Sequence, residues 1–332
     1  MNIFRVRNKK TWQPSASLEV LKVRANALAK IRDFFNQQQV MEVDVPILSS
    51  ATVPDPYLDS IIVKVNLPNI GNQLNHYLHT SPEYTMKRLL CAGSGDIYYL
   101  GKVFRQGDLS PRHQPEFTML EWYRLDFSLQ QMMEETTQVI KLILGDLNVE
   151  FISYQQAFQD YANIKNIHKA TAKACKNCLV NNNIAEIVGV DDTDKNLWEQ
   201  LILTEIIEPK LGNKGITCLH HYPAKDAALA QISANGVTAE RFEVFINKME
   251  IANGYLELQD AKIYQQRFAE SLEQRIKINK ENVPIDNHLI DALNLQGLPN
   301  CSGVALGFDR LLMLLENKQN IEQVMPFSIQ NN

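Results

Sequence analysis

The chain has 332 residues, of which 45% are hydrophobic and 21% charged, so it can bury the core of one large domain or two small ones. A formal net charge of −5 argues against a protein that coats nucleic acid by neutralising phosphates. Five cysteines, an odd and sparse set, favour a reducing compartment over a disulfide framework, and no apolar run reaches the length of a membrane span. These features predict a cytoplasmic globular protein that no membrane segment anchors.

Hydrophobic periodicity predicts helices and strands in an irregular order, without internal repeats and without a linker rich in Gly, Pro or Ser. Because hairpins and meanders outnumber regular βαβ units, we expect an α+β fold with a mainly antiparallel sheet flanked by helices. In chain order, we first expect a tail (1–16), a helix capped by Ser17 (17–35), a strand that stops at Pro46 (40–48) and a strand around Tyr77. A helix (81–95) follows, with Ser81 as N-cap, Pro82 in the first turn and Gly93 and Gly95 at its end. Beyond it we expect strands at 97–104 and 116–127, a helix (128–144), a polar helical insert (about 151–215), strands at 215–223 and 241–260, a helix to about 278, and a strand that runs into a helix (301–318).

The stretch EFTMLEWYRLDF (116–127) alternates, so its successive side chains should point to opposite faces of a strand. One face is typical of core and carries Thr118, Leu120 and Trp122. The other mixes a ring, a carboxylate and a phenol, and carries Phe117, Met119, Glu121 and Tyr123. The second face suits a flat ring and a cation; the alternative is a half-exposed face with an incidental glutamate.

Cations gather where the preceding strand ends. Arg105 directly follows the strand 97–104, and Arg112 and His113 lie in the loop beyond it. The guanidinium group presents a rigid fork of donors that binds phosphate in a bidentate manner. We therefore expect a phosphate beside this face, although loop arginines that are simply solvated remain the alternative.

A second acidic element is MEIANGYLELQD (249–260). Asn253-Gly254 is a strong two-residue hairpin signal, and such a turn would place Glu250 opposite Glu257. Like charges directly opposite each other are unfavourable unless a cation lies between them. The pair therefore predicts a site for Mg²⁺ or an ammonium group, against the alternative of two solvated glutamates.

The third element is GVALGFDRLLMLL (303–315). Gly303 and Gly307 should leave room for a ligand near the backbone, and Asp309 can cap the helix. Arg310 then falls in the first helical turn, where the helix dipole disfavours a cation unless an anion binds there. Together with the other elements, this arrangement fits a nucleoside triphosphate beside a cationic substrate.

With these residues in view, the sequence resembles class II aminoacyl-tRNA synthetases of the lysine type over about residues 17–330. The matching stretches are FRQGDLSPRHQPEFTMLEWY (104–123) for motif 2, GVALGFDRLLML (303–314) for motif 3, VMEVDVPILSSATVPD (40–55) for motif 1, and the lysine-type signatures TSPE (80–83) and EIANGYLEL (250–258). Only about sixteen residues precede the first predicted helix, which is too few for an anticodon-reading OB-fold. The chain therefore resembles the stand-alone paralogues, the elongation factor P β-lysine ligases, which implies a homodimer that uses ATP to join (R)-β-lysine to a lysine of elongation factor P.

The resemblance also implies roles for single residues. For ATP it implies Arg105 at the α-phosphate, Arg310 at the γ-phosphate end, Phe117 stacked on adenine, and Gln106, Gly107, His113, Glu250, Ile251 and Gly307 around the nucleotide. For lysine or β-lysine it implies Ser81, Pro82, Glu83, Tyr123, Glu257 and Ala305. Arg105 and Arg310 are the implied catalytic residues, and Glu250 and Glu257 the implied Mg²⁺ ligands.

Two departures from the family pattern are visible. The family often has Arg-Asn-Glu where this chain has Arg105-Gln106-Gly107, so the acid expected to meet the adenine amino group is absent and Asp108 is a candidate replacement. Ala305 stands where lysine-tRNA synthetases usually have glycine, a change that would reshape the pocket for a β-amino acid.

Two other functions stay open at this point. One is a truncated synthetase that acts on tRNA, which the net charge of −5 makes less favourable. The other is a non-catalytic paralogue that binds an amino acid, although such a protein need not keep the arginines and acids retained here. The CKNC sequence (175–178), with Cys218 and two histidines, allows a zinc site, but its spacing favours ordinary free thiols.

Overall fold

The structure, a computed structural model, describes residues 12–66, 73–184, 189 and 191–331. The helices are α1 (Leu18–Gln37), α2 (Glu83–Cys91), α3 (Leu129–Leu144), α4 (Tyr154–Ala162), α5 (Ala172–Asn181), α6 (Lys195–Ile202), α7 (Ala261–Lys277), α8 (Asn287–Leu295) and α9 (Phe308–Leu315). The strands are β1 (Met41–Glu42), β2 (Leu48–Ser49), β3 (Ile62–Asn66), β4 (Gln73–Leu78), β5 (Ile97–Phe104), β6 (Glu116–Leu125), β7 (Val149–Ser153), β8 (Ile216–His220), β9 (Arg241–Ile246), β10 (Met249–Leu256) and β11 (Cys301–Gly307).

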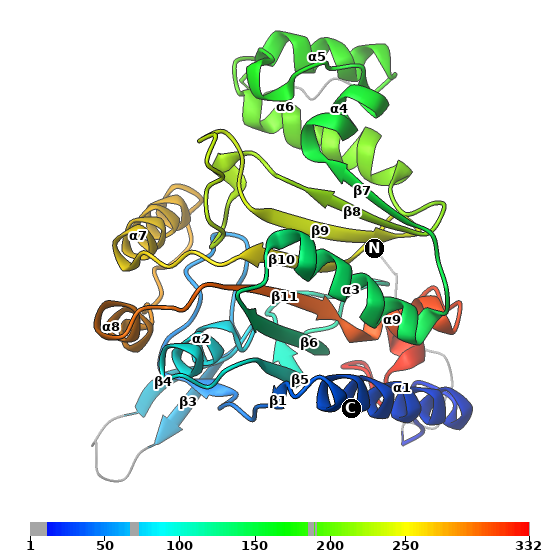
Figure 1. The fold of residues 1–332 in the computed structure, drawn as a ribbon, viewed down its shortest axis with the longest axis vertical. Coiled ribbons are helices and arrows are strands. Elements are labelled where there is room, and N and C mark those ends of the chain that lie inside the picture. Colours follow the sequence, from blue (N-terminus) through cyan, green and yellow to red (C-terminus); the bar gives the residue numbers. More distant parts are fainter. Residues whose placement is uncertain (1–11, 67–72, 185–188, 190, 332) are drawn as a thin grey trace.

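The centre of the molecule is an eight-stranded sheet in the order β1-β5-β6-β11-β10-β9-β8-β7, and β2, β4 and β3 form a small second sheet (Figure 1). In the large sheet, β1 pairs with β5 and β7 with β8 in parallel, whereas the other neighbours are antiparallel. The predicted α+β fold with a mainly antiparallel sheet is therefore confirmed.

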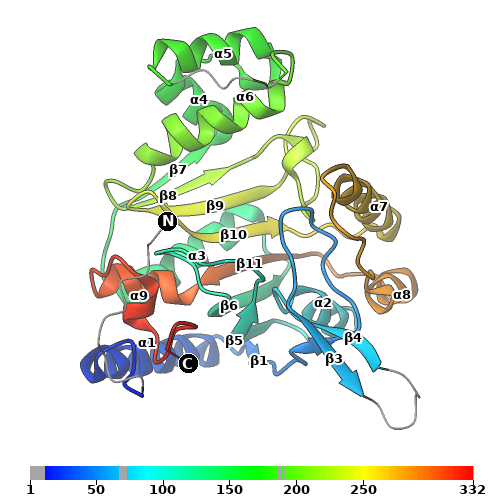
Figure 2. The ribbon, with the colours of Figure 1, turned by 180° about the vertical axis from the view of Figure 1, so that it is seen from behind.

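Helices cover the two faces of this sheet with two separate apolar clusters. Leu120 and Trp122 of β6 point into the cluster that α1, α3 and α9 complete. Met119 and Tyr123 of the same strand point the other way, into the cluster shared with α2, α7 and α8. Figure 2 shows α7, α8 and α2 together on the side opposite α1 and α9. The alternation expected for residues 116–127 is thus correct on both faces of β6, although the strand ends at Leu125 because Asp126 has a positive φ.

Several predicted helix ends are confirmed by their hydrogen bonds. Ser17 caps α1 by accepting from Val20 N, and Ser128 caps α3 in a reciprocal capping box. Ser81, in contrast, is not the N-cap of α2, because that position falls on Pro82, which makes no side-chain cap bond. The Ser81 hydroxyl still accepts from Glu83 N at 3.0 Å, but it donates into the site described below.

The predicted tail and the first predicted strand differ from the structure. Residues 1–11 lie outside the described residues, but Ser15 N and Ala16 N donate to Pro326 O and Met325 O at 2.8 and 3.1 Å, so the chain just before α1 is tied to the C-terminal segment. The alternating stretch 40–48 forms only the short strands β1 and β2. Pro46 has no N–H for a continuous ladder, and the chain crosses there from one sheet to the other.

The hairpin predicted at Asn253-Gly254 is wrong. Residues 249–256 form one continuous strand, and the chain turns earlier, at Asn247 and Lys248, which both have positive φ. Gly254 is needed for packing rather than for a turn. A Cβ there would come within 2.6 Å of the Phe242 ring and 2.8 Å of Gly303 O.

The insert is helical as expected, and α4, α5 and α6 gather at one end of the sheet (Figure 1). It starts with strand β7, which the sequence pattern did not predict. Cys175 and Cys178 are buried free thiols in its apolar core, while Cys218 belongs to a different cluster. Within the described ranges, no group of three or more His, Cys, Asp or Glu side chains could hold a metal, so the zinc alternative finds no support.

Among the helices of the described residues, none has the length and apolarity needed to cross a membrane.

Candidate active site

A cavity of about 440 Å³ opens on the face of the sheet that carries Phe117, Met119, Glu121 and Tyr123. Most of the predicted site residues line it: Ser81, Glu83, Arg105, His113, Phe117, Tyr123, Glu250, Ile251, Glu257, Ala305, Gly307 and Arg310. Pro82, Gln106 and Gly107 do not line it. The sequence prediction therefore located the pocket, and the fold arranges its charges into an arginine end and an acidic end.

At the arginine end, Arg310 is held by its neighbours and does not bend away to solvent. Its Nη1 donates to Glu250 O at 2.7 Å and lies 3.7 Å from the Glu250 carboxylate. Its Nη2 lies 2.5 Å from His113 Nε2, and the other ring nitrogen of His113 is 2.7 Å from Ser110 Oγ. Burial and the nearby Arg310 charge lower the pKa of His113, so the ring can accept from the guanidinium.

Arg105 lies beside Arg310 and packs over an aromatic ring. Its guanidinium carbon is 5.1 Å from the centre of the Phe117 ring. Arg105 Nε is buried and finds no hydrogen-bond partner among the described residues. Burial lowers the pKa of Arg105, while the charges of Asp108 and Glu250 act in the opposite direction. A partly desolvated guanidinium with an unsatisfied donor is well suited to an anionic ligand.

The loop after Arg105 differs from the family pattern for a structural reason. Gly107 has a φ of +82°, which side-chain-bearing residues rarely adopt, so the family's glutamate would be strained in this loop conformation. Asp108 is close enough to influence Arg105 electrostatically, and its role toward adenine stays a prediction.

Two expectations for the third element change in the structure. A Cβ at Gly307 would make ordinary van der Waals contact with the Arg310 side chain, whose nearest atom would lie 3.5 Å away, so there is room at this position. The space at Gly303 is instead filled by Tyr123 and Glu257. Asp309 is not a helix cap either, because the N-cap of α9 is Gly307. The Asp309 carboxylate is buried, pairs with Arg24 of α1 and accepts from Thr118 N at 2.6 Å.

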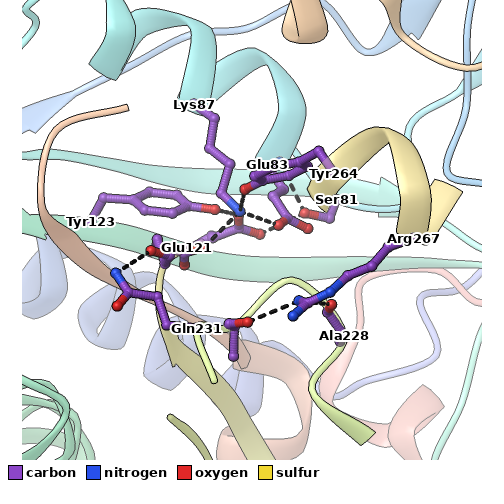
Figure 3. Close-up of polar contacts among 11 residues, drawn as sticks. Ser81, Glu83, Lys87, Glu121, Tyr123, Ala228, Gln231, Tyr264 and Arg267 are labelled. Carbon is purple, nitrogen blue, oxygen red and sulfur yellow. Dashed lines mark hydrogen bonds and ion pairs between the residues drawn. The ribbon is translucent and has the colours of Figure 1, made fainter. Parts of the chain in front are cut away.

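At the acidic end, the Glu121 carboxylate accepts hydrogen bonds from two of the predicted substrate residues. Ser81 Oγ donates to Glu121 Oε2 at 2.7 Å, and Tyr123 OH donates to Oε1 at 2.8 Å (Figure 3). Burial, followed by the charge of Glu83, raises the pKa of Glu121 from 4.5 to about 8, although both donated bonds favour the carboxylate. A cation bound nearby would lower the pKa of Glu121 and favour its charged form.

Lys87 is the main feature of this end that the sequence prediction missed. Its ammonium group donates to Glu83 Oε1 at 2.6 Å and to Tyr264 OH at 3.0 Å, and lies 2.6 Å from Glu257 Oε2 (Figure 3). The side chain is 0% exposed. Burial and the Glu83 charge raise the pKa of Glu257 to about 7, while Lys87 lowers it. Lysine at the fourth position after Glu83 on a predicted helix was a signal for this pair.

Glu250 and Glu257 do not face each other as the predicted hairpin required. A bulge between Glu250 and Ala252 lets Glu250 share the pocket side of β10 with Asn253 and Glu257. Seven positions of extended strand nevertheless separate the two acids by roughly 20 Å, which is too far for one ion to bridge. Glu250 lies at the arginine end and Glu257 at the acidic end, so their facing arrangement across a hairpin is wrong, whereas Mg²⁺ binding by these acids stays a prediction.

The raised pKa of Glu121 gives a stability prediction. Between about pH 4.5 and 8 the folded protein keeps a proton on Glu121 that the unfolded chain has released, so this group lowers the free energy of unfolding as pH rises. We expect Glu121→Gln to gain roughly a few kcal/mol relative to the wild type between pH 5 and pH 9. Urea unfolding across this range measures the difference. Glu116→Gln, on the same strand at a half-exposed site, is the control, and parallel pH curves for wild type and Glu121→Gln would contradict the assignment.

Comparison with known proteins agrees with this geometry. The sequence profile of the family described as tRNA synthetases class II (D, K and N) matches residues 5–331. The chain is 42% identical to a protein of Hamiltonella defensa named elongation factor P–(R)-β-lysine ligase, and 41% identical to proteins of the same name from Salmonella gallinarum and Salmonella arizonae. Each match covers 96% of this chain and 98% of the relative. The chain therefore belongs to the class II tRNA synthetase family of the D, K and N type and, within it, to the group of elongation factor P–(R)-β-lysine ligases.

Proposed function

We propose that this protein activates (R)-β-lysine with ATP and transfers it to a lysine side chain of elongation factor P. The observation that carries the proposal is one cavity lined by Arg105, Arg112 and Arg310 at one end and by the carboxyl groups of Glu83, Glu121 and Glu257 at the other. A triphosphate needs the first end, and an amino acid with two amines needs the second. The names of the relatives support the donor and the acceptor.

In the first step, an oxygen of the amino acid carboxylate attacks the α-phosphorus of ATP, the bond to the β-phosphate breaks, and pyrophosphate leaves. Arg105 stabilises the charge that develops at the α-phosphate, and Arg310 holds the far end of the triphosphate. In the second step, the deprotonated amine of the acceptor lysine attacks the carbonyl carbon of the adenylate, an amide bond forms and AMP leaves. No protein nucleophile is required.

The donor set at the arginine end fits Mg²⁺. Glu250 lines the pocket with a side chain that is 42% exposed, and it lies beside Arg310. Mg²⁺ is commonly held by one or two carboxylates together with substrate phosphates and water, so a single acid here suffices. When bound, the ion would neutralise charge on the phosphates. Glu250 is thus our proposed Mg²⁺ ligand, and Glu257 belongs to the amine site.

A homodimer would cover the exposed apolar side chains Met41, Ile47 and Leu48, which lie in the segment that resembles motif 1. A net charge of −5 supports a protein acceptor in preference to tRNA, whose phosphates draw on broad basic surfaces. The free thiols of all five cysteines suit a cytoplasmic location.

The test is a transfer assay. The enzyme is incubated with ATP, Mg²⁺ and labelled (R)-β-lysine or lysine, and is then offered elongation factor P or total tRNA. We expect ATP–pyrophosphate exchange without any acceptor, and label that moves to elongation factor P but not to the variant that lacks its acceptor lysine. Chelation of Mg²⁺ should abolish the exchange.

Each alternative has its own outcome in this assay. Transfer to tRNA with none to elongation factor P would favour the truncated synthetase. Amino acid binding without any exchange would favour the non-catalytic paralogue.

A further inference from the structure

A buried cation, Lys87, lies behind the acidic end of the pocket and does not line the cavity. Lys87 is 0% exposed, and it is absent from the residues that line the cavity. Its three polar partners lie far apart in the sequence: Glu83 is in α2, Tyr264 is in α7, and Glu257 directly follows β10. The ammonium group donates hydrogen bonds to Glu83 and Tyr264, and the Glu257 carboxylate lies 2.6 Å away as an ion-pair partner.

Glu83 and Glu257 both line the cavity, so Lys87 lies behind them. Lys87 Nζ forms ion pairs with Glu83 Oε1 and Glu257 Oε2. Among the described residues, no hydrogen bond is found to the other oxygen of either acid. The remaining oxygens, Glu83 Oε2 and Glu257 Oε1, are therefore the ones available to a ligand. The contacts with Lys87 thus set the orientation of both carboxylates.

The Lys87 charge also reduces the repulsion among the carboxyl groups at this end of the cavity. Glu83, Glu121 and Glu257 bring three carboxyl groups to one end of the cavity, and the last two are nearly fully buried. Like charges at such a site repel strongly, because the surroundings screen them poorly. Lys87 supplies one fixed opposite charge at the place where two of the three acids meet.

The backbone of Glu257 is fixed by further contacts. Glu257 N donates to Cys301 O at 3.0 Å, and Gln231 Nε2 donates to Glu257 O at 2.9 Å. In the side chain, Glu257 Oε1, the oxygen that Lys87 does not contact, borders Gly303, where an added Cβ would lie only 2.5 Å from it. With the backbone held, the Glu257 side chain is further restricted by its contact with Gly303 and by the 2.6 Å ion pair with Lys87.

Building on the proposed function, we propose that Lys87 is a positioning residue for the amino acid substrate. It holds Glu83 and Glu257 so that the second oxygen of each faces a substrate ammonium group, and it has no part in binding ATP. Lys87 thereby contributes to the selection of a substrate with positively charged amines, because it orients the two acids that bind them. The polar contacts of Lys87 within the described part of the chain go to Glu83, Tyr264 and Glu257, and none goes to Arg105 or Arg310.

The test separates the two substrates. For Lys87→Met we expect the KM and the calorimetric Kd for the amino acid to rise at least tenfold, while the KM for ATP changes by less than about threefold. Lys87→Arg keeps the positive charge and should recover part of the lost affinity. Lys102→Met removes a half-exposed lysine that pairs with Glu116 at 3.1 Å, and it should leave both constants unchanged.

A second pair of variants serves if Lys87→Met does not fold. Glu83→Gln removes one acid, and Lys87→Met/Glu83→Gln then removes one charge of each sign. The double variant should bind the amino acid at least fivefold more weakly than Glu83→Gln alone, since Glu257 has still lost its cation. Equal Kd values for these two variants would overturn the inference.

The outcomes also distinguish this inference from the proposed function. A wild-type enzyme that neither binds nor activates any lysine isomer would remove the proposed function itself. A wild type that activates the substrate, beside a folded Lys87→Met variant with unchanged amino acid affinity, would remove only the role of Lys87. Equal increases in both KM values, with no recovery in Lys87→Arg, would show a purely structural residue and also overturn the inference.

Discussion

Replacing Arg310 with alanine should lower ATP–pyrophosphate exchange by about two to three orders of magnitude in a protein that stays folded. The guanidinium is only 20% exposed and is already aimed by Glu250 and His113, so little rearrangement is needed when a triphosphate binds. A preorganised donor of this kind stabilises developing charge without the cost of reorienting water. Arg105→Ala should have an effect of similar size, because it removes the cation that lies over Phe117.

The control for these variants is Arg32→Ala. Arg32 is an exposed arginine that pairs with Glu42 on the surface, 3.1 Å away, and its loss should leave the exchange rate unchanged. Circular dichroism and thermal unfolding should show that each variant is folded. Near-normal exchange in both Arg310→Ala and Arg105→Ala would contradict the assignment of this end of the pocket to the triphosphate.

The largest expected effect on stability belongs to the neighbouring residue. We expect Asp309→Ala to lower the free energy of unfolding by about 3–5 kcal/mol. The variant leaves the guanidinium of Arg24 buried without its carboxylate and also removes the acceptor of Thr118 N. Both groups pay the desolvation cost without a partner. Urea unfolding at neutral pH measures the loss.

An exposed pair provides the matched comparison. Asp146 is 95% exposed and pairs with Lys141 at 3.0 Å, so Asp146→Ala should cost no more than about 1 kcal/mol. Asp309→Asn should lie between wild type and Asp309→Ala, because its amide oxygen can still accept from Thr118 N. A loss below about 1 kcal/mol in Asp309→Ala would show that the contact among α1, β6 and α9 is not a major source of stability.

Patterns that depend on near neighbours could be predicted from the sequence. The alternation of Met119, Leu120 and Tyr123 placed each side chain on its correct face of β6, because the period of a strand is a local property. Ser17 and Ser128 marked helix starts for the same reason, since a cap bonds to a backbone only three residues away. The resemblance to class II synthetases then located most of the pocket lining.

The same local reasoning failed where a residue serves a distant partner. Asn253-Gly254 has the composition of a turn, yet Gly254 is required because the Phe242 ring packs against its backbone. Asp309 has the position of a helix cap, yet its carboxylate pairs with a residue 285 positions away. In both cases the tertiary contact outweighed the local preference, because leaving a buried charge unpaired or displacing a packed ring costs more free energy than losing a turn or a cap.

The chemistry of the amine site also required the tertiary structure. The sequence by itself determined that Glu83, Tyr123 and Glu257 could meet a cation, because they match the lysine-type signatures. It could not show that Lys87 reaches Tyr264 across 177 positions of chain. Charges in a buried cluster act on one another through space in a poorly screening medium, so their states follow from distances that only the folded chain defines.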